Sequence, residues 1–392
     1  MVGRECRKKK AEEGMSLIEV MVAMVIGVAV VATAGTVLTG SGKASHTNNQ
    51  VAQTQQNARI AMDLLAEDLK IAGFGMTGTV GGCTRAIMPR DNVNTGALNA
   101  INDSGPDRVS MVLPFTSSVA PLWTLAVQPQ PNPLLPGYTG AVITLNAGAV
   151  AAMPANFKAA GAIFSLGGSY SGTVTSVAGD TITFNDPLGA TTVFPSGITP
   201  TRVFALQCIT YQVIPPPDAV NNVCGGTAPC LVRGAVAGLD CNILNSPCVP
   251  VADGIEDLQI AYACDGCVTA TPDRAVDDMA GSAAGFDTLD FVSNTDWTIA
   301  PAWFATPMSA DTIRLARITV VARETSPDQG VTEGSSPANN TSAPLIIEDH
   351  NPANGVFIAP GGAGNDFSAA TYPLTQRRRV LTRMIETRNI GN

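Results

Sequence analysis

The stretch KKKAEEGMSLIEVMVAMVIG, residues 8–27, decides the fold of this 392-residue chain, because it places one glutamate, Glu19, near the start of an apolar run. Residues 15–38 carry no other charge, and as a helix of roughly 36 Å they would cross the hydrocarbon core of a membrane. A carboxylate inside hydrocarbon costs about 2.5–3.5 kcal/mol even on the insertion scale. The sequence therefore predicts a membrane-spanning helix in which Glu19 needs a partner of opposite charge.

Two interpretations of this N-terminal segment remain open. In the first, it is an ordinary secretory signal that is cleaved after Ala34, at the A-x-A sequence of residues 32–34. In the second, residues 1–14 form a basic leader that ends at Gly14. Cleavage removes this leader, and the mature chain begins at Met15. In both, the basic run RKKK stays on the cytoplasmic side of the membrane, so the bulk of the chain is exported.

The sequence MSLIEVMVA after Gly14 resembles the class III signal of type IV pilins and their secretion-system relatives. The resemblance implies that a prepilin peptidase cuts between Gly14 and Met15 and that the new amine of Met15 is methylated. Glu19 is then the fifth residue of the mature chain. In a filament of packed helices, the free amine of a neighbouring subunit offsets its charge. An ordinary secretory signal has no use for Glu19, so we favour the prepilin interpretation.

Residues 39–73 are expected to form the amphipathic half of a long helix, after a flexible break at Gly40 and Gly42. Apolar residues at helical spacing predict a face that packs on a globular head. This face contains Ala58, Ala61, Leu65, Leu69 and Ala72, with Ile60, Leu64 and Ile71 beside them. Charged pairs are expected on the other side: Arg59 with Asp63, and Glu67 with Lys70. Gly73 ends the helix in the manner common at helix C-termini.

Residues 74–392 change to short β-like runs between turn signals, which predicts a head built on an antiparallel sheet. The expected strands are 108–114, 141–145, 172–177, 180–184, 203–213, 231–235, 257–263, 312–323 and 378–386. Several of them alternate apolar and polar residues, as half-buried strands do, and 312–323 is expected to bulge near Ala316–Arg317. Loop insertions are expected at about 115–140 and 324–376. A long helix followed only by strands predicts an α+β fold and not a βαβ enzyme.

Nine cysteines are present. Cys6 lies in the basic N-terminal segment, and the other eight lie in residues 74–392. An even set of eight suits disulfides in an oxidising compartment. The spacing favours four pairs: Cys83 with Cys208, Cys224 with Cys230, Cys241 with Cys248, and Cys264 with Cys267. A thiolate metal site or a redox CxxC at 264–267 is the alternative. With two histidines in the chain, a zinc site would have to be almost entirely thiolate.

No catalytic constellation emerges, so the sequence predicts neither an enzyme nor a cofactor or metal site. The two histidines, His46 and His350, are too few for a histidine-based triad. An acidic set could bind calcium, but it lacks the EF-hand spacing and is better explained as a solvated loop. Its members are Asp273, Asp277, Asp278, Asp287 and Asp290. The C-terminal arginines, from Arg377 to Arg388, are expected to pair with carboxylates, and a net charge of −9 argues against nucleic acid.

A second resemblance covers residues 1–83 and pieces of the chain from about 203 onward. Its motifs are QQNARIAMDLLAEDLKIAGFGM followed by GGC, then ITYQV, CLVRGAV, VADGIEDLQIAYACD, TIRLARITVVAR and RRRVLTRMIETRN. Their order is similar to that of the PilW family of minor pilins, although residues 84–200 and 324–376 match nothing in it. The resemblance implies the type IV pilin fold, with a transmembrane helix at 15–38 and a head at 74–392.

The same resemblance implies a function in assembly. A minor pilin of this type primes pilus assembly or lies at the pilus tip, together with the major pilin, other minor pilins and often a tip adhesin. It is stored in the inner membrane with its head in the periplasm before it enters the extracellular pilus. A type II secretion pseudopilin of the J type is the near alternative. A secreted binding protein released after Ala34 is the alternative from another class.

Overall fold

A computed structural model describes most of the N-terminal half of the chain and selected segments of the rest. The described residues are 16–76, 78–90, 106–115, 123–124, 142–166, 170–185, 202–216, 223–226, 228–266, 273, 275–277, 291, 312–325 and 378–387. They form two compact units, residues 1–52 and residues 53–392, and each is described here by itself. The predicted insertions at 115–140 and 324–376 lie almost wholly outside the described residues.

Helix α1 (Leu17–Ile71) is continuous, so the predicted break at Gly40 and Gly42 is wrong. A glycine inside a helix costs about 1 kcal/mol but keeps its backbone N–H and C=O, and the hydrogen-bond ladder therefore passes through both positions. Gly73 follows the helix with φ +78°, as predicted, and its N–H donates to the carbonyl of Val112 at 2.9 Å. The helix thus ends against the sheet.

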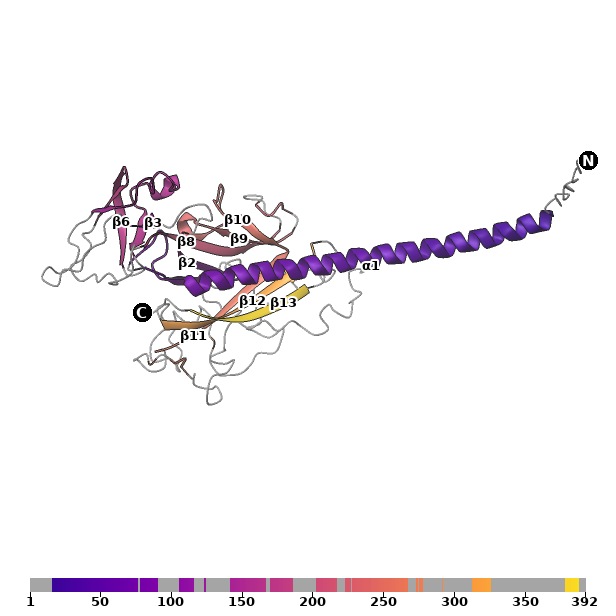
Figure 1. The fold of residues 1–392 in the computed structure, drawn as a ribbon. Helices are drawn as coiled ribbons and strands as arrows, with labels where there is room; N and C mark the ends of the chain where they lie inside the picture. Colours follow the sequence, from indigo (N-terminus) through magenta and orange to yellow (C-terminus); the bar gives the residue numbers. More distant parts are fainter. Residues whose placement is uncertain are drawn as a thin grey trace, which may run out of the picture. The chain divides into compact units, whose positions relative to one another are not determined.

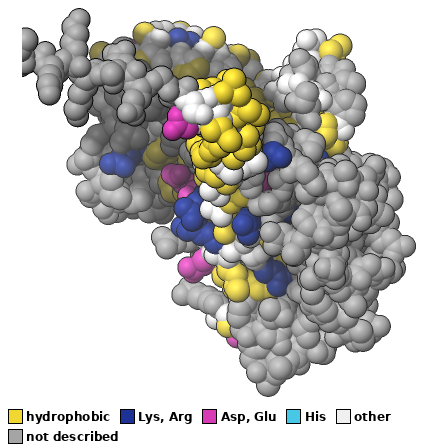
Figure 2. Space-filling view, turned by 90° about the vertical axis from the view of Figure 1, so that its right-hand side faces the viewer, with side chains coloured by type: hydrophobic (Ala, Val, Ile, Leu, Met, Phe, Trp, Pro, Cys, Tyr) yellow, Lys and Arg dark blue, Asp and Glu magenta, His cyan; other side chains and the backbone are white. Residues whose placement is uncertain are grey.

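The N-terminal part of α1 is apolar and exposed along its whole length. Within the described residues, α1 is the helix long and apolar enough to cross a membrane. Its side chains between residues 17 and 46 are all exposed, and Leu17 reaches 79%. In Figure 2, which looks toward this end of the helix, hydrophobic side chains cover it on most sides. An exposed apolar segment of this length is stabilised when another apolar surface or a membrane covers it.

The C-terminal part of α1, from residue 53, supplies one wall of the main core. Ala58, Ala61, Leu65, Leu69 and Ala72 of the predicted apolar face are buried, and Met62 and Ala66 join them. Of the three residues expected beside them, Leu64 and Ile71 are half-buried, whereas Ile60 is 44% exposed, so its place on this face was predicted wrongly. In Figure 1 this part of the helix runs between two groups of strands, with β2, β8, β9 and β10 on one side and β12 and β13 on the other. The main core contains residues from the helix and from both groups.

The first group belongs to a ten-stranded antiparallel sheet. Its strands are β1 (Ile87–Arg90), β2 (Arg108–Pro114), β3 (Trp123–Thr124), β4 (Val142–Thr144), β5 (Ile163–Leu166), β6 (Tyr170–Ala178), β7 (Thr181–Phe184), β8 (Arg202–Ile214), β9 (Cys230–Gly234) and β10 (Val249–Asp253). The order along it is β1-β2-β8-β5-β6-β7-β4, with β3 and β9 also paired to β8 and β10 paired to β9. Two short 3₁₀ helices, η1 (Ala155–Phe157) and η2 (Ala237–Leu239), lie between strands.

The second group is a three-stranded antiparallel sheet in the order β11-β12-β13. Its strands are β11 (Ile255–Cys264), β12 (Ile313–Arg323) and β13 (Arg378–Glu386). Gly254 joins it to β10 with φ +71°, and a Cβ there would lie 2.6 Å from the carbonyl oxygen of Arg323. Asp107 links the two sheets as well, because its backbone N–H donates to Leu258 and its side chain accepts from the N–H of Ile260.

The expectation of half-buried strands is wrong for β11, which is buried at every position. One face packs in the main core, and on the other Ala261 and Ala263 pack against Phe291. The bulge predicted near Ala316–Arg317 is also displaced. The register of β12 shifts between Leu315 and Ile313, opposite the end of β11, while Ala316 and Arg317 pair regularly. Sequence alternation does not reveal a strand covered on both faces, since the covering segment lies elsewhere in the chain.

A smaller core lies between β4, β5, β6, β7 and the start of β8. Its buried aromatic residues are Phe157, Phe164 and Phe184. This group extends the main sheet through β8. The α+β fold class is confirmed: a long N-terminal helix packs on antiparallel sheets, and each of the nine predicted strands overlaps an observed one. Strands β1, β3, β5 and β10 were not predicted.

Candidate functional site

Glu19 lies in the first turn of α1 and bonds to its own helix. Its Oε2 accepts a hydrogen bond from the backbone N–H of Ser16 at 2.9 Å. Ser16 and Glu19 form the S-x-x-E pattern of a capping box, in which the third helical residue satisfies the N–H of the cap residue. The negative charge also suits the positive end of the helix dipole. Sequence reasoning missed this local role, although the four letters SLIE contain its signal.

The predicted cleavage and methylation positions, Gly14 and Met15, lie outside the described residues. The structure describes the chain from Ser16, one residue after the proposed mature amine. Glu19 itself is exposed, and its Oε1 makes no hydrogen bond within the described part of the chain. Within the described residues, one carboxylate oxygen of Glu19 therefore caps the helix and the other accepts no hydrogen bond.

A buried polar cluster holds the C-terminal part of α1 on the main sheet. Asp68 of α1 accepts hydrogen bonds from the Tyr211 hydroxyl of β8 and from Nε of Arg233 in β9, the latter at 3.0 Å. Arg233 Nε also lies 2.8 Å from the Tyr211 oxygen, and the guanidinium lies 5.6 Å from the Tyr211 ring centroid. Burial, and then the Asp68 carboxylate, raises the pKa of Tyr211 well above its usual range. The phenol therefore stays protonated and can donate to Asp68.

Two arginines of the basic C-terminal strand pair with carboxylates, as expected from the sequence, whereas Arg379 is exposed with no ion pair among the described residues. Arg378 donates to Glu256 at 2.6 and 3.2 Å, and both side chains are about 3% exposed. Arg383 bonds to Asp63 of α1 at 2.9 Å, where both groups are largely exposed. Asp63 was expected to pair with Arg59. Its observed partner is instead Arg383, on a strand more than 300 residues later in the chain. Arg377 and Arg388 lie outside the described residues.

Three disulfides are present in the head: Cys83–Cys208, Cys224–Cys230 and Cys241–Cys248. They join the same cysteines that the spacing favours. Cys264 is also in a disulfide, and its expected partner, Cys267, lies outside the described residues. Cys83–Cys208 joins the loop after α1 to the central strand β8.

The acidic set acts within its own loop where the structure describes it. Asp277 accepts the N–H of Gly266 at 2.9 Å, and the N–H of Asp273 donates to Asp265 at 2.9 Å. Asp278, Asp287 and Asp290 lie outside the described residues. Among the residues described, no group of three His, Cys, Asp or Glu side chains is arranged to hold a metal ion.

The comparisons with known proteins bear on the N-terminal segment. Residues 9–35 match the model of the prokaryotic N-terminal methylation motif. A type IV-like pilin from Thermus thermophilus matches with 10% identity over 88% of this chain and 98% of that chain, at a TM-score of 0.29. A TM-score this low does not establish a shared fold. No curated protein matches the chain.

The matched motif contains Gly14, Met15 and Glu19 and extends into α1. The chain therefore carries an N-terminal methylation signal at the start of its long helix. This signal implies processing by a prepilin peptidase and a location in the membrane or in a pilus.

Proposed function

We propose that this protein is a minor pilin of a type IV pilus, of the PilW type, which helps to prime assembly or lies in the tip complex. The observation that carries the proposal is the methylation motif at residues 9–35, placed on a helix whose apolar side chains are exposed through residue 38. Helices of this kind find a stable environment in the membrane and then against one another in a filament core.

The proposed steps follow from the charges at the start of the chain. The basic leader holds the N-terminus on the cytoplasmic side, and cleavage between Gly14 and Met15 creates an amine. Methylated Met15 of one subunit and Glu19 of the next form an ion pair in a low-dielectric core, which offsets the cost of burying the carboxylate. The head stays in the periplasm and presents surfaces to the other pilins and to an adhesin.

The first experiment is intact-mass and N-terminal peptide analysis of the protein from its native membrane fraction. A chain that begins at N-methylated Met15 is the expected result. A chain that begins at Gly35 would overturn the proposal in favour of a secreted protein released after Ala34.

The docking role of Glu19 can be separated from its capping role with two substitutions. Glu19→Gln keeps a side chain that can cap the helix but removes the charge, whereas Glu19→Val removes both. We expect both variants to insert in the membrane and both to reduce incorporation into filaments severalfold, measured by immunoblot of sheared pili. If Glu19→Gln assembled as the natural chain does, capping alone would explain Glu19 and the docking role would be wrong.

A J-type pseudopilin would carry the same methylation signal, so the motif does not distinguish a minor pilin from a pseudopilin. Deletion of the gene distinguishes these two functions. We expect fewer surface pili with secretion of type II substrates unchanged. The opposite pattern would assign the protein to the secretion system and leave the processing and docking steps in place.

A further inference from the structure

The central strand β8 has a gap along one edge. On one side it pairs continuously with β2, from Leu206 to Gln212. On the other side β5 pairs with it only as far as Leu206, and β9 begins to pair at Thr210. Residues 207–209 therefore face no strand of the described chain on that side.

The backbone of Cys208 points into this gap. Its register partner on β2 is Val112, whose N–H donates to Ala86 at 3.0 Å and whose carbonyl accepts from Gly73 at 2.9 Å. Both backbone groups of Val112 are thus directed away from β8. In an antiparallel ladder this makes Val112 and Cys208 a non-hydrogen-bonded pair, so the N–H and C=O of Cys208 lie at the opposite edge. Within the described part of the chain, no group bonds to them.

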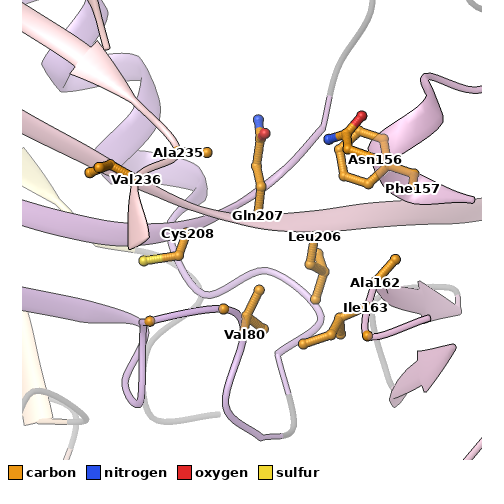
Figure 3. Close-up of a pocket in the computed structure, with 13 residues that line it drawn as sticks. Val80, Asn156, Phe157, Ala162, Ile163, Leu206, Gln207, Cys208, Ala235 and Val236 are labelled. Carbon is orange, nitrogen blue, oxygen red and sulfur yellow. The ribbon is translucent and has the colours of Figure 1, made fainter. Parts of the chain in front are cut away.

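A pocket of about 330 Å³ occupies the gap. It lies between the start of β5 and the end of β9, and it is lined by residues from both faces of the sheet. In Figure 3 the side chain of Gln207 points to one side of β8, while Leu206 and Cys208 point to the other. This arrangement is that of a missing piece of strand and not of a hollow on one sheet face.

The lining is small and uncharged. Gly161 and Ala235 leave room for a backbone to approach, since a Cβ at Gly161 would meet no atom within 4 Å. Gly81 and Gly82 also line the pocket, and Leu239 already packs against Gly82. Gln207 contributes an amide side chain with no hydrogen-bond partner within the described residues. No charged residue is among the described lining residues, so a charged ligand would lose its hydration without compensation.

We propose that the gap binds an extended, uncharged peptide segment of about three residues with small side chains, contributed by a partner protein. The central residue of the segment pairs its N–H and C=O with the C=O and N–H of Cys208. The flanking strands already fix the spacing and direction of that pairing, so the peptide completes the ladder between β5 and β9. The Gln207 amide is placed to bond to the peptide beside this pair. This inference does not depend on the filament role.

The test uses full-length protein in detergent micelles and acetyl-Ala-Thr-Ala-amide as the probe, followed by saturation-transfer NMR. Two control ligands are tested in parallel: the same peptide with the central backbone nitrogen methylated, and N-acetylglucosamine. Two variants of the protein are compared as well. Ala235→Phe fills the gap from an exposed lining position, and Ala178→Phe adds the same side chain at an exposed position of β6 outside the pocket.

We expect the unmodified peptide to bind, and to lose affinity by about tenfold when the central N–H is methylated, because one backbone hydrogen bond is removed. Ala235→Phe should reduce binding at least as much, while Ala178→Phe should leave it unchanged. The N-methyl comparison needs no variant, so it stands even if Ala235→Phe fails to fold. Equal binding of both peptides, no binding of either, or binding of N-acetylglucosamine alone would overturn the proposal.

Discussion

Two carboxylates on α1 are stabilised in different ways. Glu19 caps the exposed first turn through Ser16 with one oxygen, and its other oxygen accepts no hydrogen bond from the described residues. Asp68 lies on the buried side of the same helix and receives both Tyr211 and Arg233 from the main sheet. A buried charge is tolerated only when it is paired and hydrogen-bonded, and Asp68 has both kinds of partner within its chain.

The Tyr211 cluster predicts a pH dependence of stability. Because the pKa of Tyr211 is raised in the folded chain, the unfolded phenol ionises first, near its ordinary value of 10. The folded state then holds one more proton than the unfolded state, so the free energy of unfolding should fall above pH 10 by up to about 1.4 kcal/mol per pH unit. Below pH 10 this contribution is fully present.

Urea denaturation between pH 8 and pH 11 measures this effect. Tyr211→Phe removes the phenol and should show a shallower fall than the natural chain, while being less stable at pH 8 by about 1–3 kcal/mol. Parallel slopes for the two proteins would contradict the assignment. Lysine and arginine ionisation contributes equally to both slopes and cancels in the comparison.

The disulfides differ in what they connect. Cys83–Cys208 links the loop after the helix to the central strand across 125 residues, whereas Cys224–Cys230 closes a turn across 6 residues. A longer closed loop restricts the unfolded chain more, so it stabilises the fold more. The Cys83–Cys208 disulfide also lies beside the unpaired edge of β8, since Cys208 lines the pocket there.

This difference predicts a ranking of double substitutions. Replacing Cys83 and Cys208 by alanine should lower the free energy of unfolding by about 5 kcal/mol, and replacing Cys224 and Cys230 by about 2 kcal/mol, in the loop-entropy model. Urea denaturation under oxidising conditions gives both values. The ranking would be wrong if the short pair cost as much as the long one.

For the whole molecule, the main core begins partway along α1. The first buried residue of the helix is Thr54, and the second compact unit begins at Gln53. Everything needed to bury the main core is thus present from residue 53 onward. The N-terminal unit contributes exposed apolar surface and the methylation motif.

We therefore expect a fragment of residues 53–392 to fold without the N-terminal unit. Its free energy of unfolding should match that of the full chain within about 1 kcal/mol, because none of the described residues that are removed is fully buried. A fragment that starts at residue 66 is the matched control. It lacks the buried residues Met62 and Leu65 and should unfold or lose several kcal/mol. Circular dichroism with urea titration distinguishes the two, and an unfolded 53–392 fragment would refute the prediction.

The sequence by itself determined the features that depend on neighbouring residues. The apolar run, the helical spacing of the α1 face, Gly73 as the helix end and the methylation motif are all local patterns, and so are the alternating strands. Local patterns are readable because backbone geometry repeats every 3.6 residues in a helix and every two in a strand. Even the capping role of Glu19 was readable in this way.

Only the tertiary structure decided which distant segments meet. It brought Asp68, Tyr211 and Arg233 together from a helix and two strands, and it paired Asp63 with Arg383 instead of Arg59. It also covered both faces of β11 and left the gap beside Cys208, where β5 and β9 fail to meet. These outcomes depend on the register between strands and on where they end. Strand register is set by packing across the whole core and leaves no periodic trace in any one segment.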